Sequence, residues 1–325
     1  MTGRPSLRGG PPRHVRRGVE TLARLTCKTA SLIRVLTNPG ANIPAELLAP
    51  YDVALTSSSI VVDGETHDVR SGARLEDVDA WVAGAREFPY VLGTSAAEFV
   101  KRYVELGADR GTEVLVVMSS RKIIQSYDAA CSAVRTLTAR ASARINVVDS
   151  AMTDLGMGLP MLAAAAAAKE GATLDEATHL TEAMAAAGRF VFVPRTLDNL
   201  VKGGRASFLR GWLAQVLGVR PVLAFVEGEA GLVSKCSAKA DHCEVIADQV
   251  ETMLHAGGPS WVGISHGGVP EDAQRLADLL RERFDPQLLL VREISPSVYL
   301  HAGPKCLGAV VFPLGGLPFV PRIGT

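Results

Sequence analysis

The amino-acid sequence predicts an α/β fold, built from a parallel-sheet amino-terminal domain and a smaller α/β carboxyl-terminal domain. Short apolar segments alternate with helical patterns from Leu32 to Pro313. This alternation is typical of parallel strands joined by right-handed crossovers. The chain has 325 residues, and chains longer than roughly 250–300 residues usually divide their hydrophobic core between domains. We therefore expect two domains, with a boundary near Gly171.

The predicted strands are short apolar runs, most of them followed by polar or turn-forming residues. They lie at residues 33–36, 53–55, 114–118, 145–148, 190–193, 222–225, 261–264, 288–291 and 309–312. The second half of the chain differs from the first, because a Glu227-Gly228-Glu229 turn follows the apolar run at 219–226 and leads back through Leu232 and Val233. This pattern predicts a β-hairpin.

The predicted helices carry signals for their ends. The helix at residues 173–187 opens with a capping box, in which Thr173 and Glu176 bond each other's backbone NH groups. Another helix begins at Pro270, because proline suits the first helical position. Further helices are predicted at residues 96–106, 126–140, 158–169 and 208–217.

The two ends of the chain are expected to lie outside the folded domains, which would then span residues 31–171 and 172–314. The first 30 residues are rich in Gly and Pro, and their charges are Arg4, Arg8, Arg13, Arg16, Arg17, Arg24 and Lys28 against Glu20. This composition favours a disordered basic extension at residues 1–30. The alternatives are a polyanion-binding arm or a membrane-surface helix at residues 16–25. Residues 315–325 are expected to form a tail.

Composition excludes several classes of protein. Lys+Arg and Asp+Glu are both 34, so the basic excess that is typical of a nucleic-acid binder is missing. No apolar run reaches the roughly 18 residues of a membrane-spanning helix, and we expect no stable membrane insertion. The five cysteines are scattered, which favours reduced thiols in a cytoplasmic protein and gives no metal-binding pattern.

Polar residues follow several predicted strands. Thr37 and Asn38 end the first strand, Ser119 and Ser120 follow a later one, and Asp149-Ser150 follows the next. Ligands of open α/β sheets bind beyond the carboxyl ends of the strands. Small hydroxyl groups there can donate hydrogen bonds to an anion. The alternative is that these residues cap the helices that follow.

Two motifs in the second half bring basic residues to glycine-containing turns. In Lys202-Gly-Gly-Arg205, two glycines let the backbone turn sharply ahead of the guanidinium. In His301-Ala-Gly-Pro304, the imidazole can bond an anion or a backbone carbonyl. A solvent-exposed arginine and a carbonyl-bonded histidine are the simpler alternatives.

Together with Thr94-Ser95 and with Asp149-Ser150 ahead of Gly156 and Gly158, these motifs give a sequence that resembles the DegV family from about residue 33 to residue 313. That family includes the fatty-acid-binding subunits of bacterial fatty-acid kinases. The resemblance implies two domains that enclose an acyl chain in an apolar tunnel. It implies that a threonine and a serine hold the carboxylate near the surface. It also implies an arginine and a histidine near the head group and the kinase-docking face.

The sequence departs from the family's motifs. Thr94-Ser-Ala-Ala-Glu98 stands in place of Thr-Ser-x-Pro-Ser, and Ile123 stands where the carboxylate-binding serine is expected. Losing a donor to a buried anion costs about 1–3 kcal/mol. Arg121 or Lys122 could replace it with a charge-assisted hydrogen bond, and Ser119 or Ser120 could also reach the anion. The residue after His301-Ala-Gly-Pro304 is a lysine, where the family has glycine.

The resemblance implies a cytoplasmic lipid-binding protein that encloses a long-chain fatty acid between two domains and presents its carboxyl group to a partner kinase. It implies a carrier and not an enzyme, with no metal or cofactor. The expected ligand-binding residues are Thr94, Ser95, Ser119, Ser120, Arg121, Lys122, Asp149, Ser150, Arg205 and His301. Thr94 is the principal head-group candidate, with helix capping as its alternative role. Two other functions stay open: a scaffold or regulator with an altered or absent ligand, and an enzyme that acts on a small acidic substrate through Arg205, His301 and Asp149.

Overall fold

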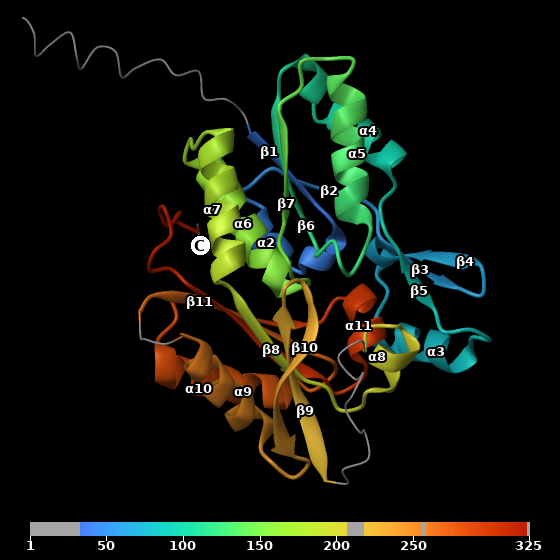
Figure 1. Cartoon of the computed structure of the whole chain (residues 1–325), viewed down its shortest axis with the longest axis vertical. Coiled ribbons are helices and arrows are strands. Elements are labelled where there is room, and N and C mark those ends of the chain that lie inside the picture. The colour runs from blue at the N-terminus through green and yellow to red at the C-terminus, as the bar shows by residue number, and fades with distance from the viewer. Residues whose placement is uncertain (1–32, 207–217, 255–257, 324–325) are drawn as a thin grey trace, which may run out of the picture. The chain divides into compact units, whose positions relative to one another are not determined.

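The structure is a computed structural model that describes residues 33–206, 218–254 and 258–323 (Figure 1). These residues form a mixed α/β fold with three β-sheets. Every strand predicted from the sequence is present, within a few residues of its expected bounds. The basic extension at 1–30 and the predicted helix at 208–217 lie outside the described residues.

The amino-terminal sheet is parallel throughout, as predicted, with the strand order β2-β1-β6-β7. Its strands are β1 (Ile33–Thr37), β2 (Val53–Leu55), β6 (Glu113–Met118) and β7 (Ile145–Asp149). The central strand β6 is buried along its whole length because helices cover both faces of the sheet. Helices α4 (Ala96–Glu105) and α5 (Ser126–Thr138) lie on one face, and α6 (Leu155–Lys169) and α7 (Leu174–Ala187) lie on the other (Figure 1). The capping box predicted at Thr173 and Glu176 is confirmed.

The carboxyl-terminal sheet has the order β10-β9-β8-β13-β11-β12. Its strands are β8 (Arg189–Val193), β9 (Val219–Val226), β10 (Glu229–Ser237), β11 (Ser260–His266), β12 (Leu288–Glu293) and β13 (Leu307–Pro313). The predicted hairpin is confirmed as the antiparallel pair β9–β10. The sheet is mixed, however, since only β11 and β12 are parallel, whereas the alternation of strands and helices had predicted parallel pairing. Helices α9 (His242–Leu254) and α10 (Pro270–Phe284) pack on its outer face.

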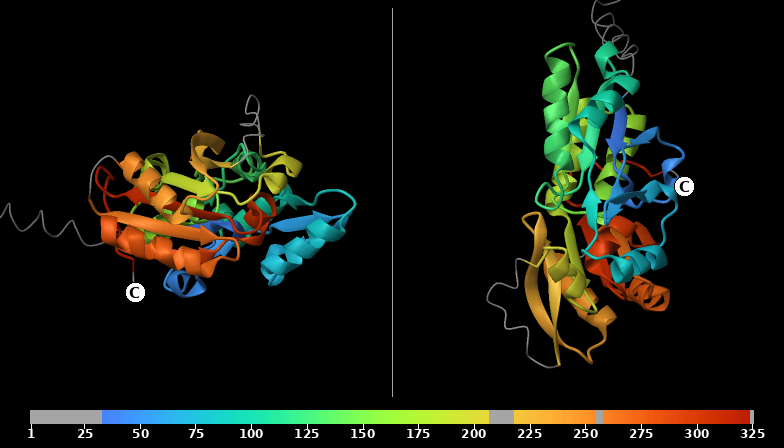
Figure 2. Two further views of the ribbon diagram at one scale, coloured as in Figure 1. Left: turned by 90° about the horizontal axis from the view of Figure 1, so that it is seen from below. Right: turned by 90° about the vertical axis from the view of Figure 1, so that its right-hand side faces the viewer.

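A third, antiparallel sheet was not predicted. It consists of β3 (Ser59–Val62), β4 (Glu65–Asp68) and β5 (Tyr90–Leu92), and α3 (Leu75–Gly84) lies beside it. Figures 1 and 2 show this group extending to one side of the two larger sheets. β4 carries only polar side chains. The apolar runs of β3 and β5 are as short as that of β2, and they were not recognised as strands.

Helix α6 joins the cores of the two larger sheets. It packs against β1 and β6 on one side and β11 on the other, and it is buried from Leu155 to Ala167. A helix that is apolar all around its circumference belongs inside a core. Gly158 allows its closest contact, because a Cβ there would lie 2.0 Å from the backbone oxygen of Ala41. The expected domain boundary near Gly171 follows this shared helix and stays a prediction.

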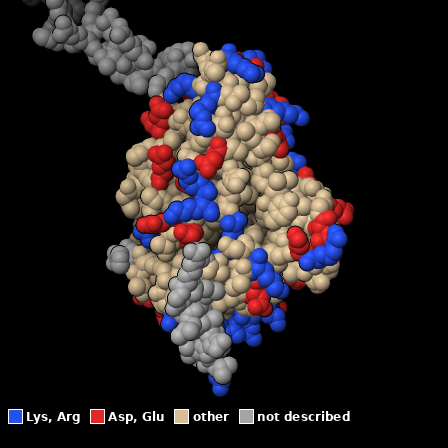
Figure 3. Space-filling model, turned by 45° about the vertical axis from the view of Figure 1, so that its right-hand side comes forward, with Lys and Arg blue, Asp and Glu red and all other residues tan. Residues whose placement is uncertain are grey.

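The remaining short elements connect these layers. They are η1 (Pro39–Ala41), α2 (Ala45–Leu48), η2 (Val69–Ser71), η3 (Ala108–Arg110), α8 (Asp198–Lys202) and α11 (Pro296–Ala302). Among the described residues, every helix is too short or too polar to cross a membrane. On the face drawn in Figure 3, basic and acidic side chains lie interspersed, in keeping with the formal net charge of zero.

Candidate functional site

A cavity lies where the carboxyl ends of the parallel strands face the inner side of the carboxyl-terminal sheet. It contains about 1290 Å³ of space free of protein atoms, including its opening to solvent. It is lined by the loops that follow the parallel strands, by strands of the carboxyl-terminal sheet, by α11 and by Val91 of the third sheet.

One wall of the cavity is aromatic. Phe190 and Phe192 on β8 and Phe225 on β9 all line it, and their ring centroids lie 5.5–6.2 Å apart. Isoleucine, leucine and valine side chains continue the apolar surface, among them Ile124 and Leu307. A wall of this kind favours an apolar ligand because contact removes hydrocarbon surface from water.

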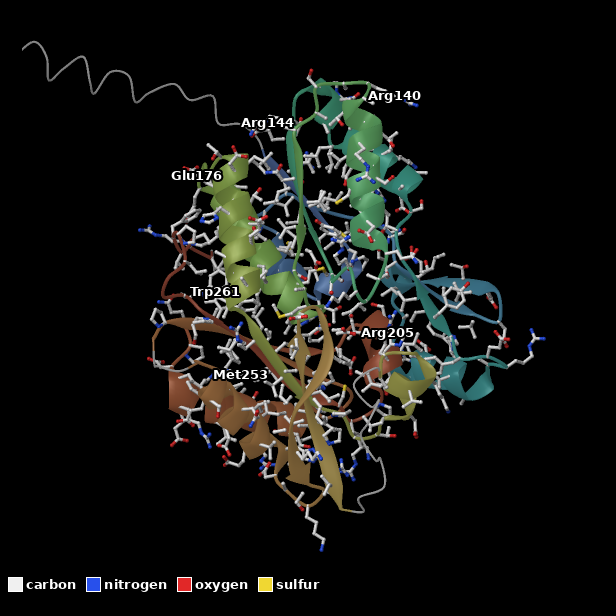
Figure 4. All side chains as sticks on the ribbon, in the orientation of Figure 1. Arg140, Arg144, Glu176, Arg205, Met253 and Trp261 are labelled. Carbon is white, nitrogen blue, oxygen red and sulfur yellow. The ribbon has the colours of Figure 1, made fainter. Side chains whose placement is uncertain are left out.

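Arg205 and His301 meet at the cavity wall, although 96 positions separate them in the sequence. Figure 4 shows Arg205 beside α11, whose last turn carries His301. The two glycines of the Lys-Gly-Gly-Arg motif explain this placement. A Cβ at Gly203 would lie 2.3 Å from the His301 Nδ1 atom, and Gly204 turns the chain with a φ of +70°. Glycine is therefore required at position 203 and favoured at position 204.

The electrostatics of this pair favour a bound anion. Burial lowers the pKa of His301 to about 4, with a smaller contribution from the positive charge of Arg205, so the imidazole is neutral at pH 7. Burial also lowers the pKa of Arg205, but a guanidinium stays charged at physiological pH. Within the described part of the chain, the buried Arg205 Nε and His301 Nδ1 atoms have no hydrogen-bond partner, and no carboxylate forms an ion pair with Arg205. An anionic ligand would supply the missing partner.

Arg121 and Lys122, the two cations expected to replace the carboxylate-binding serine at position 123, have different surroundings in the loop after β6. Lys122 and Ile123 line the cavity. Arg121 does not: its guanidinium donates to the Asp128 carboxylate at 2.9 Å and lies 5.2 Å from the centre of the Tyr127 ring. Of the two candidate cations, Lys122 is therefore the one beside the cavity.

The β9–β10 hairpin contacts this same loop. The Lys122 Nζ atom lies 3.8 Å from a Glu227 carboxylate oxygen and 3.9 Å from one of Glu229. Ser120 donates a hydrogen bond from its hydroxyl to the Gly228 backbone oxygen. Ser119 lines the cavity, whereas Ser120 lies outside its lining and holds the hairpin tip. The loop thus has one serine facing the cavity and one that joins two sheets.

Thr94 and Ser95 lie beside the cavity lining without forming part of it. The Thr94 hydroxyl lies 2.7 Å from the Ser57 backbone oxygen and 2.8 Å from the Thr56 hydroxyl, and its single proton bonds one of these. Ser95 accepts a hydrogen bond from the Glu98 backbone and is the N-cap of α4. The alternative that Thr94 caps this helix is therefore wrong, while its role at the head group stays a prediction.

Asp149 and Ser150 also lie outside the cavity lining. The Asp149 carboxylate accepts hydrogen bonds from the backbone NH groups of Ala151, at 2.8 Å, and Arg121, at 3.4 Å. Ser150 is fully buried and bonds the backbone of Met152. The structure therefore brings Arg205 and His301 together but leaves Asp149 in a turn-forming role.

Several polar residues that line the cavity were absent from the predicted site: Asn38, Ser58, Thr153, Glu229, Ser265 and Ser297. Asn38 had been noted at the end of a predicted strand, and Ser58 follows the end of β2 closely enough for the same reasoning to find it. Thr153 could not be found in this way, because the turn after β7 has unusual backbone angles, with positive φ at Ala151 and Asp154. In the described ranges, no cluster of three or more His, Cys, Asp or Glu side chains could hold a metal ion.

Comparisons with known proteins agree with this architecture. A DegV domain-containing protein of Streptomyces coelicolor is 29% identical over 293 residues, which cover 86% of this chain and 98% of the relative. A fatty-acid-binding DegV family protein from Thermus thermophilus has a similar solved structure, with a TM-score of 0.79 and 21% identity over 87% of this chain and 99% of that one. For a fatty-acid-binding DegV family protein from Streptococcus agalactiae, the TM-score is 0.76 and the identity 22%, over 86% and 98% of the two chains. These structures share the fold. Residues 32–314 match the family described as uncharacterised DegV family proteins, and the chain belongs to the DegV family.

Proposed function

We propose that the protein is a cytoplasmic carrier that encloses a long-chain fatty acid and presents its carboxyl group to a partner kinase. One observation carries the proposal: a cavity has an aromatic wall and, within the described residues, a partly buried arginine without an anionic partner. An acyl chain would occupy the apolar part. Its carboxylate would lie beside Arg205 and His301.

The physical argument rests on the cost of burying charge. A buried cation without a partner is unfavourable, and an anion that bonds it removes this cost. A carboxylate can accept two parallel NH groups from one guanidinium, which adds directionality to the attraction. The relatives from Thermus thermophilus and Streptococcus agalactiae are described as fatty-acid-binding, which supports the same ligand class here.

A carrier fits the site better than an enzyme does. Catalysis of acid–base or nucleophilic type needs a second reactive group held beside the first. Asp149, the acid expected to join Arg205 and His301, is engaged by backbone NH groups outside the cavity lining. The cavity itself argues against a scaffold whose pocket has been filled by side chains. Delivery to a kinase rests on the family resemblance and belongs to the proposal.

A binding titration tests the proposal. Protein stripped of lipid is titrated with palmitic acid and, separately, with methyl palmitate, which has the same chain but no charge. We expect the acid to bind about tenfold or more tightly, since a hydrogen bond to a charged group contributes about 1.5–3 kcal/mol. Equal affinity for acid and ester would refute an anion site, and failure of both to bind would refute acyl binding.

A further inference from the structure

A row of polar side chains crosses the cavity at the carboxyl edge of the parallel sheet. Ser58 follows β2, Asn38 follows β1, Ser119 follows β6 and Thr153 follows β7. This is the order of the four strands in the sheet. All four side chains line the same cavity, each contributed by the segment that follows its strand. We call these four residues the polar row.

The polar row is buried but has unused hydrogen-bonding capacity. Exposed fractions are 6% for Ser58, 7% for Asn38, 5% for Ser119 and 8% for Thr153. Among the described residues, the hydroxyls of Ser58 and Thr153 have no hydrogen-bond partner, and Ser119 donates only to the Met157 sulfur at 3.4 Å. Asn38 accepts from the Gly40 backbone, but its own amide NH groups have no acceptor in the same residues.

Ser297 on α11 brings a fifth polar side chain to the cavity and connects the polar row to the head-group end. It is 8% exposed and likewise has no side-chain partner in the described ranges. Its hydroxyl lies near Gly40, since a Cβ added there would be 3.7 Å away, and Gly40 is two residues from Asn38. Ser297 and His301 are four residues apart on α11, so their side chains lie on one face, about 6 Å apart. The polar surface therefore continues within one helical turn of the proposed carboxylate position.

A plain alkyl chain would fit this part of the cavity poorly. It would displace water from several donors and acceptors and offer them no hydrogen bond, which is costly for each group that it covers. We infer that the preferred ligand is a fatty acid with a second oxygen function close to its carboxyl end, as in a 3-hydroxy fatty acid. This inference rests on the proposed function. It adds that the polar row and Ser297 bond the extra oxygen, while the phenylalanine wall contacts the rest of the chain.

The test compares three ligands with the same chain length. Lipid-free protein is titrated with palmitic acid, 3-hydroxypalmitic acid and 16-hydroxypalmitic acid. We expect 3-hydroxypalmitic acid to bind about tenfold more tightly than palmitic acid, which is a difference of about 1.4 kcal/mol. The 16-hydroxy acid should bind no more tightly than palmitic acid, because its hydroxyl is at the apolar end of the cavity.

Variants test whether the polar residues of the cavity cause the preference for 3-hydroxypalmitic acid. Ser297→Ala should reduce the affinity ratio of 3-hydroxypalmitic to palmitic acid several-fold, and Thr153→Val provides the same comparison if Ser297→Ala does not fold. Ser142→Ala, at an exposed position, is the control and should leave the ratio unchanged. If the unmodified protein binds 3-hydroxypalmitic acid no more tightly than palmitic acid, the inference is wrong but the proposed function stands. Water would then satisfy the hydrogen bonds of the polar row. Failure of all three acids to bind would overturn the proposed function as well.

Discussion

The side-chain hydroxyl of Ser120 donates a hydrogen bond to the backbone oxygen of Gly228, with 2.5 Å between the two oxygen atoms. This bond joins the loop after β6 of the amino-terminal sheet to the tip of the β9–β10 hairpin of the carboxyl-terminal sheet. Gly228 has a φ of +90°, and a Cβ there would lie 2.6 Å from the Ser120 hydroxyl oxygen. Lys122 and Glu229, beside this contact, both line the cavity. The Ser120–Gly228 hydrogen bond therefore holds the tip of the β9–β10 hairpin at the edge of the cavity.

We expect Ser120→Ala to release bound fatty acid faster. The variant loses one hydrogen bond, worth about 0.5–1.5 kcal/mol, so the release rate should rise about two- to tenfold. Stopped-flow displacement of a fluorescent fatty acid measures this rate. Ser142→Ala is the control for the loss of an exposed serine. An unchanged release rate in Ser120→Ala would show that the hairpin contact does not limit ligand exchange.

Arg205→Gln should weaken fatty-acid binding about 10- to 100-fold, because it removes a charge-assisted hydrogen bond worth roughly 1.5–3 kcal/mol. Methyl palmitate should lose much less affinity, since it offers no negative charge. Lys202→Gln is the matched control: it removes a positive charge from an exposed position in the same segment. Isothermal titration with the acid and with the ester distinguishes binding of the carboxylate by Arg205 from a structural role of Arg205. Equal losses for acid and ester would mean that Arg205 supports the fold of the site and does not bind the carboxylate.

Protonation of His301 should make the stability of the ligand-free protein depend on pH. Burial lowers the pKa of His301 to about 4, whereas histidine in an unfolded chain has a pKa of about 6.5. Between these values the unfolded chain binds more protons, so the free energy of unfolding falls as the pH falls, by up to about 3 kcal/mol from this one group.

His301→Gln should remove this part of the pH dependence, measured by urea unfolding between pH 7 and pH 4. His179→Gln, at an exposed position, is the control. Burial also lowers the pKa of His266, so part of the slope remains in His301→Gln. A bound carboxylate should raise the pKa of His301 and reduce the loss of stability. Identical pH profiles for His301→Gln and the unmodified protein would contradict the assignment.

Asp154 is expected to be the most sensitive buried position near the cavity. It is fully buried, and its carboxylate accepts hydrogen bonds from the Ser265 hydroxyl at 2.5 Å, from the Ser295 backbone at 3.1 Å and from the Asn42 amide at 3.1 Å. Asp154→Ala leaves these donors without an acceptor and should destabilise the protein by about 3 kcal/mol or more. Chemical unfolding measures the change.

Asp285→Ala is an exposed control for removing an aspartate at a position of positive φ. It accounts for the positive φ alone, because the ψ of Asp285 is +60° and that of Asp154 is −138°. The difference between the two variants then reports the hydrogen bonds of Asp154. Similar losses of stability in Asp154→Ala and Asp285→Ala would mean that the hydrogen bonds contribute little.

The sequence predicted the strands of the two larger sheets because their residues are apolar and buried, as in β6. It did not predict the third sheet. β4 is Glu65, Thr66, His67 and Asp68, with no apolar face, and the short apolar runs of β3 and β5 were not singled out. Apart from the β9–β10 hairpin, the antiparallel pairs of the carboxyl-terminal sheet were also missed. The choice between parallel and antiparallel neighbours depends on long-range contacts that the local pattern does not contain.

The candidate site was predictable only in part. Family resemblance singled out Arg205 and His301, which do meet, but spacing alone could not bring residues 96 positions apart together. Arg121 and Lys122 are neighbours in a turn, and only the fold decides that one faces Asp128 and the other the cavity. The position of Thr153 depends on a turn in which Ala151 and Asp154 have positive φ angles. Residues other than glycine rarely adopt such angles.

Native mass spectrometry of the protein as purified from cells tests the central claim most directly, because it weighs the protein together with whatever the cavity holds. We predict an added mass equal to one long-chain fatty acid, lost on denaturation and identified as a free acid after organic extraction. Stripped protein should regain that mass when palmitic acid is added. Protein that carries no acyl ligand from cells and takes up none when the acid is supplied would contradict the account.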